Sequence, residues 1–342
     1  MYKRLISVLF FLVCTQLNVA LQPNQPFKQP FFSQPHIYDD FIYGFNEEKQ
    51  FSLYSLIGDF IYSFKETNYN LESQKIYFNK VFLLDENKQL SVFDLKSQQK
   101  YYSIKGYDIR DFVISSSHLI ILTDKGDIVC FDYLTGTFKW QLPDLAIDGI
   151  YFFGQSGFLL AYKDKTMYII STQLASVEKK VVFKHLIDSV LSATNSFAVV
   201  QAKKPYILTL VDYSLNDFDV FDVSQIKHWY RKKAAVGYDD SLNSFFLYDL
   251  SLEEYSWFVQ ADSDVSDFLF SDTYLCFIDV TGVVNIISLY DGEVVKQGRY
   301  DLDEKAESFT FVDENWYIIT KSKLLLIEDN NDLSITLDIQ NE

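Results

Sequence analysis

The sequence of 342 residues contains no long hydrophobic segment beyond its first twenty residues. No later stretch has ~18 uninterrupted apolar residues, the length that a membrane-spanning helix needs. We therefore expect the mature chain to be soluble in a secretory or periplasmic lumen, and to associate with membranes only through partners.

Cysteine is scarce, with three residues in the chain. Cys14 lies in the N-terminal hydrophobic segment, whereas Cys130 and Cys276 lie in apolar, strand-like runs far apart in the sequence. We predict that these two are reduced thiols in the core, with a disulfide between them as the alternative. No Asn-x-Ser/Thr sequence occurs, so the chain offers no attachment point for an N-linked glycan.

The motifs of common catalytic and metal sites are also missing. There is no glycine-rich phosphate loop, no Gly-x-Ser-x-Gly sequence, and no cysteine and histidine in one local unit. Residues 262–267 resemble half of a calcium loop, but the mid-loop glycine and the closing glutamate are absent, which favours a solvated turn. No two of the four histidines have a metal-ligand spacing; they are His36, His118, His185 and His228. The sequence predicts no enzyme, no cofactor site and no metal site.

Basic residues are in the minority, with 30 Lys and Arg against 47 Asp and Glu, which gives a net charge of -17. Removal of residues 1–20 would take away two cations and no acid, and would change the net charge from -17 to -19. A chain this acidic repels phosphate backbones and anionic lipids. We therefore expect no nucleic-acid partner.

The N-terminal twenty residues have the pattern of a secretory signal peptide. A short basic start precedes an uncharged apolar run at residues 5–13, and Ala20 provides a small residue for cleavage. This run is too short to span ~30 Å of hydrocarbon. The alternative is a buried N-terminal strand.

Residues 21–36 form a proline-rich segment, because four of the six prolines in the chain lie between residues 22 and 35. Proline removes backbone donors and fixes φ, so this segment is expected to be an extended arm outside the sheet interior. A proline-motif ligand for a partner is the alternative. Residues 37–342 are predicted to form one domain.

That domain contains an internal repeat of short Val, Ile, Leu, Phe and Tyr runs, which are typical of strands. Each copy has a polar residue near the end of a run, and we call these residues the markers. They are separated by 37 to 41 residues. The markers are Ser55, Asp94, Asp132, Ser171, Asp212, Asp249, Ser288 and Glu328.

A repeat of this length with about four strands per unit predicts an all-β propeller of eight four-stranded blades. One blade cannot bury both of its apolar faces alone, so neighbouring blades stack in a ring until the last contacts the first. Seven blades are the alternative, because the first and fifth units match the repeat loosely. We also expect an inserted loop at residues 222–237.

One basic segment, residues 227–233, stands out in this acidic sequence. Its cations and aromatic residues form a candidate contact for an acidic partner surface or for lipid headgroups. A long loop with solvated charges is the alternative. The candidate partner-contact residues are Lys227, Trp229, Tyr230, Arg231, Lys232 and Lys233.

Residues 132–140 match Asp-x-x-Thr-Gly-x-x-x-Trp, a pattern that resembles quinoprotein-like (PQQ-like) propellers. The resemblance implies that Trp140 docks against the neighbouring blade. Trp257 and Trp316 also lie in or after strand-like runs, and we expect all three to be blade-core residues. The chain lacks the adjacent cysteine pair of quinone-dependent dehydrogenases, so the resemblance implies no cofactor.

The order of residues 37–45, 91–98 and 132–140 behind a signal peptide is similar to the N-terminal lumenal propeller of the largest subunit of the endoplasmic reticulum (ER) membrane protein complex. This resemblance implies a non-enzymatic scaffold in the ER lumen that assists transmembrane-protein insertion, with other subunits of a membrane complex as partners. Two alternatives are a secreted or periplasmic protein-binding propeller, such as the bacterial barrel-assembly lipoprotein, and a propeller enzyme. A stress-sensor propeller would require a downstream membrane helix.

Overall fold

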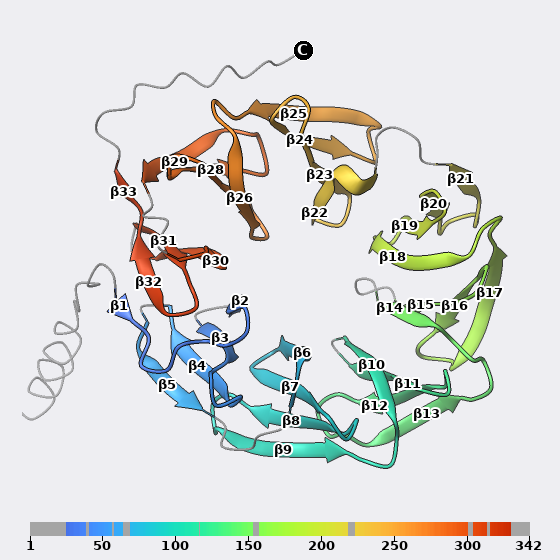
Figure 1. Cartoon of the computed structure of the whole chain (residues 1–342). Helices are drawn as coiled ribbons and strands as arrows, with labels where there is room; N and C mark the ends of the chain where they lie inside the picture. The colour runs from blue at the N-terminus through green and yellow to red at the C-terminus, as the bar shows by residue number, and fades with distance from the viewer. Residues whose placement is uncertain are drawn as a thin grey trace, which may run out of the picture.

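Eight antiparallel sheets stand in a ring around a common axis (Figure 1). The computed structural model describes residues 25–38, 41–56, 58–63, 69–115, 117–152, 157–217, 223–299, 304–312 and 315–329. The predicted signal peptide and residues 21–24 lie outside these ranges. The predicted all-β propeller with eight four-stranded blades is confirmed, and the seven-blade alternative is wrong. The one helix of the described residues is a single 3-10 turn, η1 (Val223–Gln225).

The first four blades are built from consecutive strands, with the first strand of each blade nearest the axis and the fourth on the outside (Figure 1). Their strands are β2 (His36–Tyr38), β3 (Phe41–Phe45), β4 (Phe51–Ser55), β5 (Phe60–Ser63), β6 (Tyr69–Tyr77), β7 (Lys80–Asp85), β8 (Leu90–Asp94), β9 (Gln99–Ile104), β10 (Ile109–Ile114), β11 (His118–Thr123), β12 (Ile128–Asp132), β13 (Phe138–Leu142), β14 (Gly149–Phe152), β15 (Phe158–Lys163), β16 (Thr166–Ser171) and β17 (Ser176–Val182).

Blades 5 to 7 follow the same order, and the outer strand of blade 8 comes from the N-terminal segment. The strands are β18 (Ile187–Ala193), β19 (Phe197–Ala202), β20 (Tyr206–Thr209), β21 (Leu215–Asp217), β22 (Ile226–Tyr230), β23 (Ala234–Asp239), β24 (Ser244–Asp249), β25 (Glu254–Gln260), β26 (Val265–Phe270), β27 (Tyr274–Asp279), β28 (Val283–Ser288), β29 (Val294–Arg299), β30 (Ser308–Val312), β31 (Asn315–Ile319), β32 (Lys323–Leu326), β1 (Gln25–Pro26) and β33 (Glu328–Asp329).

The middle strands are mostly apolar on both faces because both faces of each blade are covered. In β12, Val129 and Phe131 pack in the core between blades 2 and 3, whereas Ile128 and Cys130 pack in the core between blades 3 and 4. Each large side chain buried in this way contributes ~1.5–3 kcal/mol. The seams between blades therefore hold the ring together.

Cys130 and Cys276 are free and buried, as predicted for reduced core thiols. Burial raises the pKa of the Cys130 thiol to about 12 and that of the Cys276 thiol further still. Both groups are therefore neutral thiols at physiological pH.

Six of the eight markers end the third strand of their blade, at β4, β8, β12, β16, β24 and β28. In blade 5 the third strand, β20, ends at Thr209, three residues before the marker Asp212. In blade 8 the third strand, β32, ends at Leu326, and the marker Glu328 lies in β33. Of the two units that match the repeat loosely, the fifth has a third strand of only four residues, whereas the third strand of the first blade ends at its marker, Ser55.

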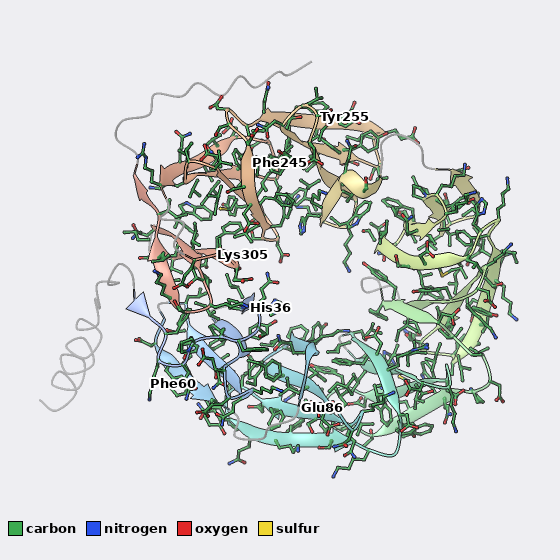
Figure 2. All side chains as sticks on the ribbon, viewed as in Figure 1. His36, Phe60, Glu86, Phe245, Tyr255 and Lys305 are labelled. Atoms are coloured by element: carbon green, nitrogen blue, oxygen red, sulfur yellow. The ribbon has the colours of Figure 1, made fainter. Side chains whose placement is uncertain are left out.

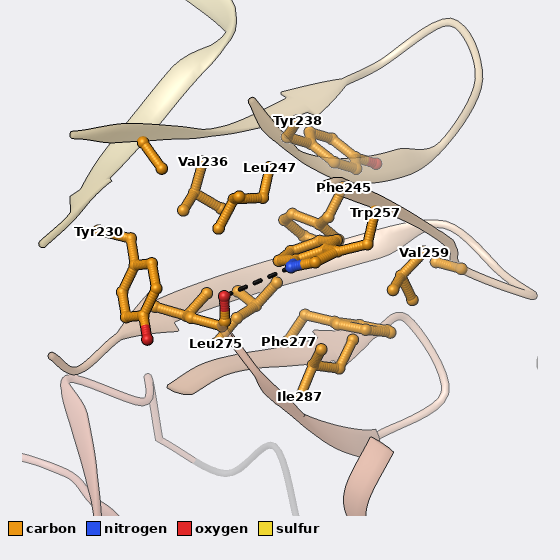
Figure 3. Close-up of a cluster of buried hydrophobic side chains, with 13 residues drawn as sticks. Tyr230, Val236, Tyr238, Phe245, Leu247, Trp257, Val259, Leu275, Phe277 and Ile287 are labelled. Atoms are coloured by element: carbon orange, nitrogen blue, oxygen red, sulfur yellow. Dashed lines mark hydrogen bonds between the residues drawn. The ribbon is translucent and has the colours of Figure 1, made fainter. Parts of the chain in front are cut away.

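A hydrogen bond from an aromatic side chain links several neighbouring blades. The donor lies eight residues after a marker, and the acceptor is the carbonyl one residue after the next marker along the chain. These bonds are Tyr102 Oη to Tyr133 O (2.5 Å), Trp140 Nε1 to Thr172 O (2.9 Å) and Trp257 Nε1 to Leu289 O (3.4 Å). Figure 3 shows the Trp257 bond within the core between blades 6 and 7.

The expected docking of Trp140 on the next blade is thus confirmed. Trp257 is buried as expected, and Trp140 is half-buried. Trp316 is buried too, but it lies in β31, where it packs edge-on against Tyr274 of blade 7 with ring centroids 4.9 Å apart.

The described part of the proline-rich segment closes the ring. β1 pairs antiparallel with β32, and the Phe27 and Phe31 N–H groups donate to Ser322 O and Lys321 O, both at 2.7 Å. Pro26 is tolerated there because β1 is an outer strand. Phe27 and Phe31 are buried against Tyr54 of blade 1, so this segment joins the last blade to the first.

β33 adds a fifth strand to blade 7, where it pairs with the outer strand β29. No helix in the described part of the chain has the length and hydrophobicity needed to cross a bilayer.

Candidate functional site

The basic segment forms the inner strand β22 and the tight turn to β23 in blade 6. The expected inserted loop at residues 222–237 is therefore wrong over residues 223–237, and residue 222 lies outside the described residues. Arg231 and Lys232 have positive φ angles of 48° and 59°, and Lys233 N–H donates to Tyr230 O at 3.2 Å. Positive φ at both central residues closes a hairpin compactly. Asn or Gly is expected at such positions, so the sequence did not predict a tight turn at Arg231 and Lys232.

The six candidate partner-contact residues have different environments. Tyr230 is buried in the core between blades 6 and 7, and Trp229 is half-buried against the core that faces blade 5. Lys227 Nζ donates to Ser224 O at 3.0 Å, and Lys233 Nζ lies 3.2 Å from the Asp249 carboxylate. Within the described residues, Arg231 and Lys232 are exposed and make no ion pair.

The turn that carries these two cations is fixed to three blades. Ser192 Oγ of blade 5 donates to Lys232 O at 2.8 Å, and Leu250 N–H of blade 6 donates to Lys233 O at 3.0 Å. The Arg231 guanidinium lies 4.9 Å from the centroid of the Tyr230 ring and 6.0 Å from that of Tyr290 in blade 7. The two positive charges are thus held on a rigid base.

This turn belongs to one end of the propeller, which we call the turn rim. It comprises the turns from first to second strand and from third to fourth strand, which share one end of each blade because successive strands run in opposite directions. Large apolar side chains, 47% to 78% exposed, lie in these turns over blades 2 to 7. They are Phe78, Leu134, Leu174, Val211, Leu252 and Tyr290.

An open cavity of about 560 Å³ lies along the inner strands of blades 2, 3 and 4, and Tyr43 of blade 1 also lines it. Its lining includes Tyr77, Ile114 and Phe152, the last residues of three inner strands, so the cavity lies toward the turn rim. Lys75 and Asp111 form an ion pair across its wall at 3.3 Å. Aliphatic and aromatic side chains with few polar groups are typical of binding cavities.

Sequence reasoning missed the exposed apolar residues and the cavity. A signal was present, because Leu134, Leu174, Leu252 and Tyr290 each lie two or three residues after a marker. These positions are in turns, where exposed large hydrophobic residues are informative.

The histidines and acidic runs do not converge. Among the described residues, no three His, Cys, Asp or Glu side chains lie together as a metal site would require. His228 stacks on Phe270 with ring centroids 4.9 Å apart, and burial lowers its pKa. Residues 262–264 connect blades 6 and 7, and Val280 N–H donates to Asp264 O at 3.0 Å. Residues 265–267 already belong to the inner strand β26, so the expected turn over residues 262–267 is wrong for its second half.

Neither a protein-family model nor a curated protein matches this chain. Solved structures do match. The chain resembles the computationally designed protein Ika8 (TM-score 0.61, 12% identity, covering 89% of this chain and 98% of Ika8). BamB from Moraxella catarrhalis matches with a TM-score of 0.53 and 12% identity, covering 92% of this chain and 98% of BamB.

A third similar structure is the dihydro-heme d1 dehydrogenase NirN in complex with DHE, with a TM-score of 0.60 and 9% identity, covering 90% of this chain and 78% of NirN. A designed protein, BamB and a dehydrogenase share this architecture, so the likeness shows the propeller fold and selects no function.

Proposed function

We propose that this chain is a non-enzymatic propeller that binds an acidic surface of a partner protein through its turn rim. One observation carries the proposal: Arg231 and Lys232 are unpaired within the described residues, on a turn fixed to three blades, in a chain of net charge -17. The two uncompensated cations form a local positive patch on this acidic chain, and such a patch is complementary to an acidic patch on a partner.

Exposed apolar side chains beside the cations supply area that a partner can bury. Tyr290 lies next to Arg231, and Leu252 lies in the turn that bonds to Lys233 through Leu250. Arginine and tyrosine are enriched among the residues that dominate binding energy at interfaces. Because the turn is already fixed, little conformational entropy is lost when a partner binds.

The finer proposal is that the partners are subunits of the ER membrane protein complex, with the chain in the ER lumen and in contact with the membrane only through them. It is supported by the resemblance of residues 37–45, 91–98 and 132–140 to that complex's lumenal propeller. The alternative is a periplasmic or secreted binding propeller.

The test is recovery of partners from native membranes with the double variant Arg231→Glu/Lys232→Glu. We expect recovery to fall about tenfold or more, because both charges then repel an acidic surface. The matched control is Lys125→Glu/Lys165→Glu, which makes the same charge change in exposed turns at the opposite end of blades 3 and 4.

We expect the control to retain partner recovery and both variants to retain the wild-type melting temperature. Equal recovery by the two double variants would remove the turn rim as the binding surface. If wild-type chain recovers no subunit of the ER complex, the finer proposal is wrong.

A further inference from the structure

The outer strand of each blade presents backbone N–H and C=O groups that could pair with another chain, and proteins usually protect such edges. Most outer strands here carry protection of a known kind. β5, β21 and β1 have four residues or fewer, and β1 contains Pro26. Four longer outer strands contain lysine or arginine, at Lys100 of β9, Lys139 of β13, Lys179 and Lys180 of β17, and Lys296 and Arg299 of β29.

Among the described outer strands, β25 lacks the protection of the other long ones, apart from a bulge between Tyr255 and Trp257, where its register with β24 shifts. It is seven residues long, Glu254–Gln260, and contains neither lysine, arginine nor proline. Tyr255 and Phe258 are 40% and 39% exposed, and their ring centroids lie 4.7 Å apart. Figure 2 shows Tyr255 on the outer side of the ring.

The aromatic face of β25 is rigid, and the adjacent blade 5 leaves it exposed. Tyr255 packs edge-on against Phe246 and Tyr248 of β24, at 5.6 and 5.0 Å between ring centroids. This face is directed toward blade 5, whose outer strand β21 has only three residues. An added strand could therefore pair with β25 and cover both exposed rings.

The propeller already shows that an outer strand can accept such an addition. β33 pairs antiparallel with β29 in blade 7, with Gly298 opposite Asp329 and Arg299 opposite Glu328. In the second pair, opposite charges of β29 and β33 face each other.

We propose that β25 is a strand-addition site for an extended segment of a partner protein. The segment is apolar where it meets Tyr255 and Phe258, and carries lysine or arginine near the exposed Glu253 and Glu254. Backbone hydrogen bonds supply affinity and the alternate side chains supply selectivity in this mode of recognition. A second copy of the chain fits poorly, because each copy has a net charge of -17 and the two repel.

The β25 edge is separate from the two rim cations, because β25 is the outermost strand of blade 6 and Arg231 follows the innermost one. Glu253 lies in the turn rim, but Tyr255 and Phe258 lie within β25. The two proposals can therefore fail separately.

The test uses the full chain and a synthetic peptide of alternating valine and threonine with a lysine at each end. A peptide of the same composition with two central prolines is the negative probe, since proline cannot donate to a strand ladder. Backbone hydrogen exchange, followed by mass spectrometry, should show protection of residues 254–260 by the first peptide only. Tyr255→Lys/Phe258→Lys should weaken binding about tenfold or more, because charges then oppose the peptide lysines.

Phe138→Lys/Val182→Lys is the matched control, with two lysines added at exposed positions of β13 and β17. We expect this control and Arg231→Glu/Lys232→Glu to bind the peptide as the wild type does. No protection of β25 at ~1 mM peptide, where even weak binding of ~4 kcal/mol is half-saturated, would overturn the proposal. Protection of a different outer strand would do the same, as would a dimer in sedimentation experiments that Tyr255→Lys/Phe258→Lys abolishes.

Discussion

At the scale of single residues, side-chain oxygens of turn acids fix the start of each turn. Asp94 accepts the N–H groups of Lys96 and Ser97 at 3.1 and 2.8 Å, and Lys80 lies 3.1 Å from its carboxylate. The Ser97 N–H, followed by the Lys80 side chain, lowers the pKa of Asp94 against the opposing effect of burial. The charged carboxylate is therefore part of the folded structure.

Asp94→Asn should destabilise the protein at pH 7 by ~1–2 kcal/mol, because the Lys80 pair and the charged hydrogen bonds are lost. A carboxyl with a lowered folded pKa contributes stability that is present above its unfolded pKa of ~3.9 and is lost as the pH falls through the folded value. The difference from wild type should therefore shrink below pH ~4. Urea unfolding at a series of pH values measures this difference in the free energy of unfolding.

Asp124→Asn is the control, because this exposed carboxylate pairs with Lys88 at the surface, where ion pairs contribute ~0–1 kcal/mol. A destabilisation by Asp94→Asn that stays constant from pH 7 to pH 3 would contradict the assigned role of the charge.

At the scale of elements, the turns from third to fourth strand share one backbone geometry. The fourth residue after the marker has a positive φ in five blades: Gln98 (56°), Gly136 (68°), Ala175 (52°), Glu253 (58°) and Gly292 (77°). Positive φ alone does not require glycine at this position, since other residues occupy it. Glycine is needed where an aromatic side chain from the preceding blade lies against the turn. Tyr102 does so at Gly136, and Trp257 does so at Gly292.

Gly136→Ala should destabilise the protein more than Gly106→Ala does. Both residues have positive φ, which costs ~1–2 kcal/mol for alanine. A Cβ at Gly136 would lie 2.5 Å from the Tyr102 ring, whereas a Cβ at Gly106 would meet nothing within 4 Å. The clash adds ~1–3 kcal/mol. Denaturant unfolding compares the two variants, and equal losses of stability would show that the Tyr102 side chain moves away from the turn without cost.

The periodic part of this fold could be predicted from the sequence, and the rest could not. The markers are local signals that recur in each copy of the repeat, so they predicted the eight blades, whereas the docking of Trp140 was implied by the resemblance of residues 132–140 to quinoprotein-like propellers. The pairing of Gln25 with Leu324 has no local signal, because it joins distant parts of the chain once. The turn at Arg231 was missed because charged residues occupy its positive-φ positions.

The candidate site was predictable only as a set of residue types. The sequence singled out the cations of residues 227–233, but burial of Tyr230 and pairing of Lys233 depend on contacts with other strands and blades. Likewise, Tyr290 becomes a neighbour of Arg231 only because blade 7 stacks on blade 6.

At the scale of the whole molecule, the ring is closed by the segment that precedes blade 1. Phe31 is 2% exposed and packs against Tyr54, whereas the adjacent Phe32 is 52% exposed. The seam between blades 8 and 1 therefore relies on a few side chains from outside the regular repeat.

Phe31→Ala should destabilise the protein by ~3–5 kcal/mol, the usual cost of removing a buried phenylalanine side chain. Phe32→Ala removes the same atoms from the surface and should change the stability by less than ~0.5 kcal/mol. Thermal or urea unfolding measures both. Similar stabilities of the two variants would show that the arm does not hold the closing seam.

The closing contact also sets an order for biosynthesis. Phe27 donates to Ser322, which the ribosome adds 295 residues later. At ~5–20 residues per second, the nascent segment with Phe27 and Phe31 waits roughly 15 to 60 s for its partner strand. During that interval two aromatic side chains, destined for the core, stay uncovered at the front of the emerging polypeptide, where a chaperone can hold them until the final blade has been made.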